Sequence, residues 1–304
     1  MPSRLTAAAL LALLLATTGC ATAADPEPEP SASTEAPTPV AAPPVDIASA
    51  MAALEQQYGA RLGVYAIDTG SGAEAAHRAD ERFAFASTIK VLAAGALLAT
   101  RSDEELDQPV PVPSRLEYWS PITEQHAGGT MTAREVAAAA ASYSDNTAAN
   151  LLFDLLGGPA GLEAELREVG DTTIEVERTE PGLNEATPGD PRDTTTPRAF
   201  AATLRAYVLG DALDDTDRAQ LVEWMRGNTT GDALIRAGVP AGWTVGDRTG
   251  NAAYGTRNDV AVLWPDDGSE PIVLVIMSSK NAQDAEHDDA LIADATRAVV
   301  DALR

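Results

Sequence analysis

Apolar residues follow two different periods along the chain, and the changes between them predict its elements. Residues 47–58 repeat apolar positions every three or four residues, as an amphipathic helix does. Residues 61–67 have the pattern of a strand, and a turn at residues 68–72 leads to a second strand at residues 73–77. The N-terminal part of the folded chain is therefore predicted as a helix followed by a hairpin.

Strand patterns return only near the C-terminus. Residues 243–248, 259–264 and 272–278 are predicted strands, the last two joined by a turn at residues 265–268, and a helix over residues 285–304 ends the chain. The middle, from residue 88 to about residue 226, has helical periods, including residues 133–141, 147–156 (ending before Gly157) and 197–209.

Strands at both ends and helices between them predict a two-lobed α/β (α+β) fold. The terminal segments pair into one mostly antiparallel five-stranded sheet flanked by the N- and C-terminal helices, and the middle forms an all-helical lobe. The predicted boundaries are about residues 45–80 and 217–304 for the sheet lobe, and about residues 81–216 for the helical lobe.

The first 44 residues have the composition of an export signal and a tether. Arg4 precedes an apolar run at residues 7–16, which is too short to cross a bilayer, so residues 1–20 are predicted as a signal peptide. Cys20, the single cysteine, stands where a bacterial lipoprotein carries its lipid, although Thr17 replaces the usual leucine three positions before it. The alternative is cleavage at residues 21–24, which releases a soluble protein.

Residues 21–44 are rich in proline, glutamate, alanine, serine and threonine, and we expect a disordered tether there. The tether leaves residues 45–304 as one folded domain. We expect the protein on the outer face of the cytoplasmic membrane or in the periplasm, anchored by a lipid on Cys20, with a fraction of it secreted.

Charge and histidine placement exclude several functions. Lys and Arg number 21 against 46 Asp and Glu, a formal net charge of −25, which argues against a nucleic-acid partner. His77, His126 and His287 are scattered without metal-ligand spacing, so neither a metal nor a cofactor is expected.

Three short motifs follow one another in the chain. In Ser87-Thr88-Ile89-Lys90, a serine and a lysine share the first turn of a predicted helix, a geometry that can activate a hydroxyl, although a serine there also commonly caps a helix. Ser144-Asp145-Asn146 follows in a loop between two predicted helices, and Arg248-Thr249-Gly250 ends a predicted strand. Each motif is weak alone, because these are also ordinary turn or surface residues.

A long segment without regular periodicity, residues 178–197, lies between the second and third motifs. A loop of this length inside a compact domain is usually functional.

With this segment, the chain resembles the class A serine β-lactamases, which share a two-lobed fold with the penicillin-recognising transpeptidases. The resemblance covers residues 45–304 and includes three longer strings, SxxK followed by VL, SDNTAANLL and EPxLNEAxPxDxRDTTTP. It implies hydrolysis of the β-lactam amide bond of penicillin- and cephalosporin-type antibiotics, and hence antibiotic resistance.

The resemblance implies the following catalytic roles. Ser87 is the nucleophile that forms the acyl-enzyme, and Ser144 passes a proton to the leaving lactam nitrogen. Glu180, with Asn184, activates the water that cleaves the acyl-enzyme. The base for acylation is either Lys90 or Glu180 acting through water.

It also implies the residues that bind substrate and support the site. The backbone N–H groups of Ser87 and Asn251 form the oxyanion hole, and Asn146 binds the acylamino side chain. The remaining substrate-binding candidates are Arg248, Thr249, Gly250, Arg257 and Trp119, the last being either a wall of the cleft or ordinary packing. Asn150, Arg178 and Asp193 are interpreted as supports of the loop.

The chain departs from the family at Arg248, where most members carry lysine. Arginine can still bind the carboxylate of a substrate, and it offers a planar, bidentate fork. Arg257 matches a second cation directed at the same carboxylate. In the family, the lysine at this position can tune the proton transfer by Ser144, and its replacement by arginine puts that role in doubt.

Two rival functions remain at this point. A penicillin-binding D-Ala-D-Ala peptidase shares the serine, lysine and cationic-strand motifs but typically lacks the deacylating glutamate. A non-catalytic envelope lipoprotein would keep the fold as a binding module. In each case we expect a monomer.

Overall fold

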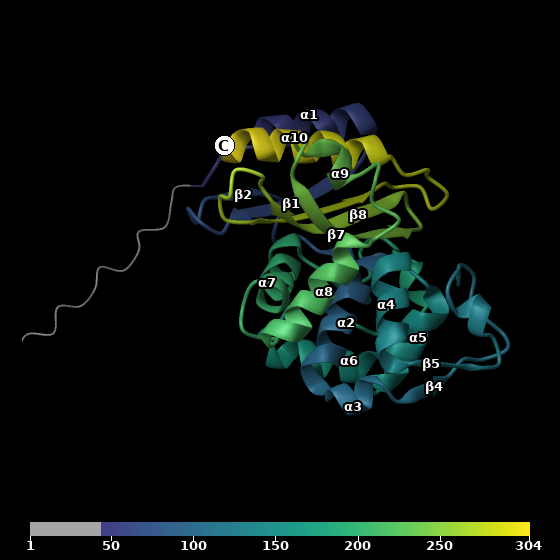
Figure 1. Cartoon of the computed structure of the whole chain (residues 1–304). Coiled ribbons are helices and arrows are strands. Elements are labelled where there is room, and N and C mark those ends of the chain that lie inside the picture. Colours follow the sequence, from purple (N-terminus) through teal and green to yellow (C-terminus); the bar gives the residue numbers. More distant parts are fainter. Residues whose placement is uncertain (1–43) are drawn as a thin grey trace, which may run out of the picture. The chain divides into compact units, whose positions relative to one another are not determined.

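The central sheet is built from both ends of the folded chain. The computed structural model describes residues 44–304, so the predicted signal peptide, Cys20 and nearly all of the predicted tether lie outside the described residues. The strands are β1 (Arg61–Asp68), β2 (Glu74–His77), β7 (Thr244–Ala252), β8 (Thr256–Trp264) and β9 (Ile272–Ser279). Their order is β2-β1-β9-β8-β7, and all neighbours are antiparallel (Figure 1). The predicted five-stranded antiparallel sheet is confirmed.

The two faces of this sheet belong to two separate hydrophobic cores. Successive strand residues point to opposite faces. Accordingly, Leu62 and Val64 of β1 pack in one core, whereas Val273 and Val275 of β9 pack in the other. Apolar side chains on both faces explain why these strands are nearly continuous apolar runs rather than strictly alternating ones.

Two helices cover the first face. α1 (Ala48–Tyr58) and α10 (Asp289–Leu303) contact each other and lie side by side over the sheet (Figure 1). Both flanking helices were predicted. α10 begins four residues later than expected, because the preceding residues 281–288 are mostly polar and only Leu291 starts the buried stripe.

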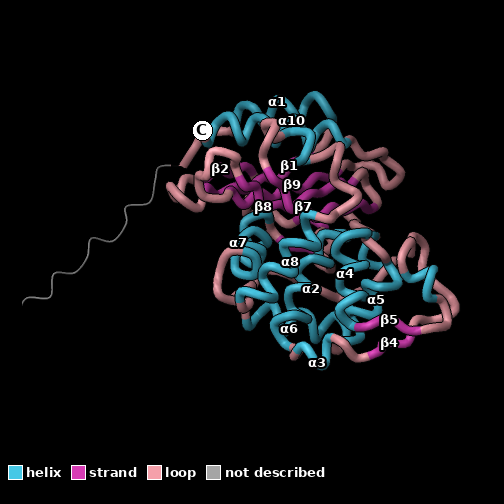
Figure 2. The backbone as a smooth tube through the Cα atoms, in the orientation of Figure 1, coloured by secondary structure: helices cyan, strands magenta, loops and turns pink. Residues whose placement is uncertain are grey.

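The other face meets a group of helices (Figure 2). They are α2 (Ile89–Thr100), α3 (Asp103–Leu106), α4 (Ala133–Tyr143), α5 (Asn146–Leu155), α6 (Gly158–Glu168), α7 (Pro197–Val208) and α8 (Asp215–Arg226). The short helix α9 (Ile235–Gly238) packs against α10 instead. The 3₁₀ turns are η1 (Ala86–Thr88), η2 (Thr123–His126) and η3 (Gly182–Asn184).

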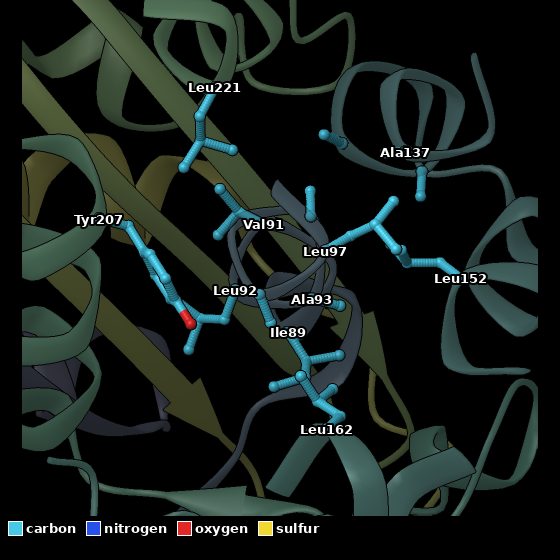
Figure 3. Packing of buried hydrophobic residues seen from close by; sticks show 14 of the residues in the cluster. Ile89, Val91, Leu92, Ala93, Leu97, Ala137, Leu152, Leu162, Tyr207 and Leu221 are labelled. Atoms are coloured by element: carbon cyan, nitrogen blue, oxygen red, sulfur yellow. The ribbon is translucent and has the colours of Figure 1, made fainter. Parts of the chain in front are cut away.

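Helix α2 is the axis of this group. Residues 89–98 are all buried, as expected for a helix that is apolar on every side. Figure 3 shows Leu92 and Leu97 of α2 surrounded by side chains from other helices, among them Leu152 of α5 and Tyr207 of α7. Gly95 permits the close approach of α7, because a Cβ there would lie 2.9 Å from the ring of Tyr207. The start of α2 is therefore held in place by packing on all sides.

Two short ladders interrupt the lobe that the sequence predicts as all-helical. β3 (Phe83–Ala84) pairs with β6 (Thr194–Thr195), and β4 (Pro109–Pro111) pairs with β5 (Thr130–Thr132). Segments of two or three residues are too short to show a strand period, and the prolines in β4 obscure it further. The first ladder joins the chain just before Ser87 to the end of the long loop.

Within residues 44–304, no helix is both long enough and apolar enough to span a bilayer.

Candidate active site

Ser87 lies in η1, which continues directly into α2. Its side chain caps neither helix, and its Oγ instead donates a hydrogen bond to Glu180 Oε1 at 3.1 Å. The capping interpretation is therefore wrong. The preceding residue, Ala86, has φ 49°, a left-handed conformation that is unfavourable for alanine. Such strain persists only where the surrounding structure holds the backbone in place, and here it sets the direction of Ser87.

Lys90 is completely buried one turn further along. Its Nζ lies 2.8 Å from Glu180 Oε1, 2.6 Å from Asn146 Oδ1 and 3.0 Å from the carbonyl oxygen of Ser144. Burial lowers the pKa of Lys90 to about 8, although the Glu180 carboxylate opposes this shift. Three acceptors match the three donors of a protonated amine, whereas a neutral amine has only two. The contacts thus favour the charged form at neutral pH.

The Ser144-Asp145-Asn146 motif joins α4 to α5. Ser144 has a left-handed conformation, φ 59°, and its Oγ lies 3.4 Å from Lys90 Nζ. Asp145 is fully buried and accepts a hydrogen bond from the Thr123 hydroxyl. It also accepts from the backbone N–H of Ala148 in the first turn of α5, and thus caps that helix. These bonds fix the turn, so that Ser144 and Asn146 both face the lysine.

Two asparagines hold Glu180, one from α5 and one from the long loop itself. Asn150 of α5 donates from Nδ2 to the Glu180 carbonyl oxygen at 2.9 Å and accepts from the Glu180 N–H at 2.8 Å. Asn184 Nδ2 donates to the second carboxylate oxygen, Oε2, while Asn184 Oδ1 is buried without a hydrogen-bond partner among the described residues. An unpaired acceptor beside a carboxylate is suited to holding a water.

The two ends of this loop are joined by an ion pair. Asp193 is fully buried and pairs with Arg178, whose side chain is 16% exposed. Asp193 Oδ1 also accepts from the backbone N–H groups of Glu177 and Arg178 at 2.9 and 3.0 Å. One carboxylate thus closes the loop that carries Glu180.

Arg248-Thr249-Gly250 lies within β7 rather than at its end. The strand continues to Ala252, because residues 249–252 pair with residues 256–259 of β8. The prediction ended the strand early because glycine and asparagine, which follow Thr249, are poor strand formers and common turn residues. Gly250 allows β7 to lie against η1, since a Cβ there would be 3.0 Å from the Phe85 carbonyl oxygen.

The two predicted anion-binding cations differ in their surroundings. Arg248 is completely buried, which lowers its pKa to about 10 and still leaves it charged at neutral pH, helped by the carboxylates of Asp247 and Glu180. Its Nε and Nη2 have no hydrogen-bond partner among the described residues. Arg257 instead donates from Nε to Asp289 at 2.6 Å, at the start of α10. Arg257 is therefore already paired with a carboxylate, whereas two nitrogens of Arg248 have no partner among the described residues.

A cleft of about 450 Å³ opens above these residues. Nine of the predicted site residues line it, namely Ser87, Trp119, Ser144, Asn146, Asn184, Thr249, Gly250, Asn251 and Arg257. Lys90, Glu180 and Arg248 are buried beneath its surface, whereas the side chains of Asn150, Arg178 and Asp193 bind the loop that carries Glu180. Trp119 is 53% exposed and donates from Nε1 to the Tyr143 carbonyl oxygen, so it forms part of the cleft wall.

Sequence reasoning missed two residues that line the cleft, Tyr118 and Thr230. Tyr118 is 85% exposed and adjoins Trp119, so the prediction of Trp119 in the cleft wall could have suggested Tyr118 as well. Thr230 belongs to a polar loop after α8, and nothing in its local sequence marks it. Only the packing of this loop beside β7 brings it to the site.

No group of three or more histidine, cysteine or acidic residues within residues 44–304 is arranged to hold a metal ion.

The family model and the relatives that match this chain all point to one family. Residues 46–303 match the family model described as the beta-lactamase enzyme family. A beta-lactamase of Amycolatopsis lactamdurans is 54% identical over 270 residues, covering 88% of this chain and 89% of that protein. The beta-lactamase AST-1 of Nocardia asteroides is 55% identical over 255 residues, covering 83% of this chain and 82% of the relative.

Solved structures agree with these relatives. A halotolerant bacterial beta-lactamase superimposes with a TM-score of 0.83 at 55% identity, covering 84% of this chain and 98% of the other. A class A beta-lactamase from Clostridium kluyveri DSM 555 gives a TM-score of 0.82 at 45% identity, with coverage of 84% and 97%.

The loop closure can be tested with Asp193→Ala. This change removes a buried ion pair and leaves two backbone N–H groups without their acceptor, so we expect the free energy of unfolding to fall by about 3 kcal/mol. Amide hydrogen exchange should increase selectively in residues 178–193, as measured by mass spectrometry.

The matched control is Asp190→Ala in the same loop, where the partner Arg192 is half exposed. An exposed pair contributes about 1 kcal/mol or less, so this variant should behave like the wild type. Equal exchange in the two variants would contradict the role assigned to Asp193.

Proposed function

This chain belongs to the class A β-lactamases and hydrolyses β-lactam antibiotics, and on that premise we propose that Ser87, Lys90 and Glu180 carry out the reaction through a covalent acyl-enzyme. The observation that carries the proposal is the position of Glu180 Oε1, which accepts from Ser87 Oγ at 3.1 Å and from Lys90 Nζ at 2.8 Å. One carboxylate oxygen thus joins the nucleophile to a buried cation.

In the acylation step, Glu180 accepts the proton of Ser87, and Ser87 Oγ attacks the lactam carbonyl carbon. We assign the base to Glu180 rather than Lys90, because the three acceptors around Lys90 Nζ favour an amine that already carries its proton. The charge that develops on the carbonyl oxygen is stabilised by the N–H groups of Ser87 and Asn251. The carbon–nitrogen bond then breaks, and Ser144 gives its proton to the nitrogen. Lys90, whose Nζ lies 2.8 Å from Glu180 Oε1 and 3.4 Å from Ser144 Oγ, gives a proton to Ser144 and takes the proton held by Glu180, which is thereby ionised again.

In the deacylation step, Glu180 takes a proton from water, and the resulting hydroxide attacks the ester carbonyl. The unpaired Oδ1 of Asn184 supports this role, because it supplies an acceptor for the same water. When the tetrahedral intermediate collapses, Glu180 returns the proton to Ser87 Oγ, and the opened product is released. Asn150, Arg178 and Asp193 act indirectly, by holding the loop that carries Glu180.

Substrate binding is assigned to the remaining residues of the cleft. Thr249 lines the cleft and donates to the carboxylate of the substrate, and the buried charge of Arg248 beneath it attracts that carboxylate. Arg257 is a second cation, shared with Asp289. Asn146 binds the acylamino group, and Gly250 and Asn251 form the strand edge along which the substrate lies. Trp119 forms the outer wall of the cleft, where an aromatic surface can pack against the substrate side chain.

The contacts of Glu180 and Asn184 favour this function over the two rivals. A penicillin-binding peptidase stops at the acyl-enzyme with β-lactams and does not need a carboxylate held beside its serine. A non-catalytic lipoprotein does not need the buried charges of Lys90 and Glu180, which are costly to maintain. We also assign residues 45–304 as the catalytic domain of a monomer.

Glu180→Gln tests the division between the two steps. The amide cannot accept a proton, so deacylation should almost stop. Acylation should only slow, because loss of the Glu180 carboxylate lowers the pKa of Lys90 and allows the neutral amine to take the proton of Ser87. We expect a mass increase equal to that of the bound penicillin to persist on the intact protein, and steady-state turnover to fall by more than about 1,000-fold.

Ser87→Ala is the control, and it should form no adduct at all. Undiminished turnover by Glu180→Gln would contradict the deacylation role.

For localisation, we propose export and lipid attachment at Cys20, supported by the signal-like residues 1–20 and by the position of this single cysteine. Metabolic labelling with radioactive palmitate in a bacterial host should label the wild type and bring it into the membrane fraction. Cys20→Ser should be exported without label. Equal recovery of both forms from the soluble fraction would favour cleavage at residues 21–24.

A further inference from the structure

A threonine outside all the recognised motifs joins the anion-binding groups of the cleft. Thr230 Oγ1 lies 2.6 Å from Thr249 Oγ1 and 2.8 Å from Asn228 Oδ1. It is also the nearest acceptor to Arg248 Nη1, at 3.5 Å. Asn228, Arg248 and Thr249 are all at least 97% buried, whereas Thr230 is partly exposed and lines the cleft.

The chemistry of these atoms restricts where their protons lie. Asn228 Oδ1 only accepts hydrogen bonds, and each threonine hydroxyl has a single proton. In one arrangement, Thr249 donates to Thr230 and Thr230 donates to Asn228. In the other, Thr230 donates to Thr249, and Thr249 donates into the cleft. Asn228 Oδ1 is not left unpaired in the second arrangement, because it also accepts from the Thr230 N–H at 3.2 Å.

We propose that Thr230 is a positioning residue that directs the Thr249 hydroxyl and the Arg248 guanidinium to the carboxylate of the β-lactam substrate. This inference rests on the proposed function of the cleft. A carboxylate accepts hydrogen bonds and cannot donate them, so its arrival selects the second arrangement, in which the Thr249 proton points into the cleft. Two hydroxyl protons rotate, and the Thr230 side chain turns away from Asn228 Oδ1, because two oxygens 2.8 Å apart repel each other when no proton lies between them.

The hydrogen bond between the Thr230 and Thr249 hydroxyls also explains how the cleft selects an anion at this position. When Thr230 donates to Thr249, the Thr249 hydroxyl becomes a stronger donor, because hydrogen bonds in a chain polarise one another. Arg248 has no other acceptor for Nη1 at hydrogen-bond distance among the described residues, and its Nε and Nη2 are unpaired. Thr230 therefore holds one edge of the guanidinium, and the charge of Arg248 lies directly beneath the Thr249 hydroxyl that meets the substrate.

The test compares Thr230→Val with wild type on a penicillin and on its methyl ester. Valine keeps the shape of threonine and removes the hydroxyl. For the free acid we expect KM to rise about tenfold with kcat within twofold, since one hydrogen bond to a charged group is lost. For the ester, which lacks the negative charge, both constants should change by less than about twofold.

Two further variants separate positioning from a general effect on structure. Thr230→Ser retains the hydroxyl and should restore the KM of the acid to within about twofold of wild type. Thr229→Val is the matched control, because Thr229 is an exposed neighbour whose hydroxyl contacts only the Ser142 carbonyl oxygen, at 3.3 Å. It should leave both substrates unaffected.

The proposal is overturned if Thr230→Val raises the KM of acid and ester equally, or if Thr230→Ser behaves like Thr230→Val. Thr230→Ala provides the same comparison if valine prevents folding, which thermal unfolding will reveal. Failure of the proposed function is distinguishable, because it would appear as the absence of a Ser87 adduct in Glu180→Gln and of turnover in wild type, whereas all Thr230 variants should still hydrolyse the substrate.

Discussion

The ion pair between Lys90 and Glu180 is the interaction on which the rest of the site depends. Both side chains are buried, at 1% and 0% exposure, and they lie 2.8 Å apart. Removing two charges from water costs several kcal/mol per ion, and their attraction repays this only when further hydrogen bonds satisfy both groups. The surrounding structure supplies those bonds from Asn146, Ser144, Ser87 and Asn184.

Each part of the fold that contributes to the site positions Lys90 or Glu180 or satisfies its hydrogen bonds. The packing of α2 on all sides fixes Lys90, and the turn between α4 and α5 presents two acceptors to it. The loop that carries Glu180 is closed by Asp193 and fixed from below by Asn150. This ion pair is costly to bury, and the surrounding hydrogen bonds and packing hold it in one geometry. That geometry leaves the Ser87 hydroxyl with a carboxylate as its acceptor.

The sequence predicted the sheet and most helices because their apolar periods are long. It placed the catalytic candidates because the motifs around Ser87, Ser144 and Glu180 are specific in combination. It did not predict the full length of β7, where Gly250 and Asn251 have poor strand propensity and are held by pairing with β8. Nor did it predict the engagement of Arg257 by Asp289, or the place of Thr230. These contacts join residues from separate elements, and no local pattern records them.

The most direct measurement is the protonation state of Lys90, because Glu180 can act as the base in both steps only if Lys90 keeps its proton. The chain contains two lysines, Lys90 and Lys280, so ¹⁵N-lysine labelling gives two side-chain NMR signals to follow with pH. The account predicts a charged Lys90 at pH 7 that loses its proton near pH 8. Because the Glu180 carboxylate raises the pKa of Lys90, Glu180→Gln should move this midpoint to lower pH. A neutral Lys90 at pH 7 in the wild type, or the same midpoint in both proteins, would contradict it.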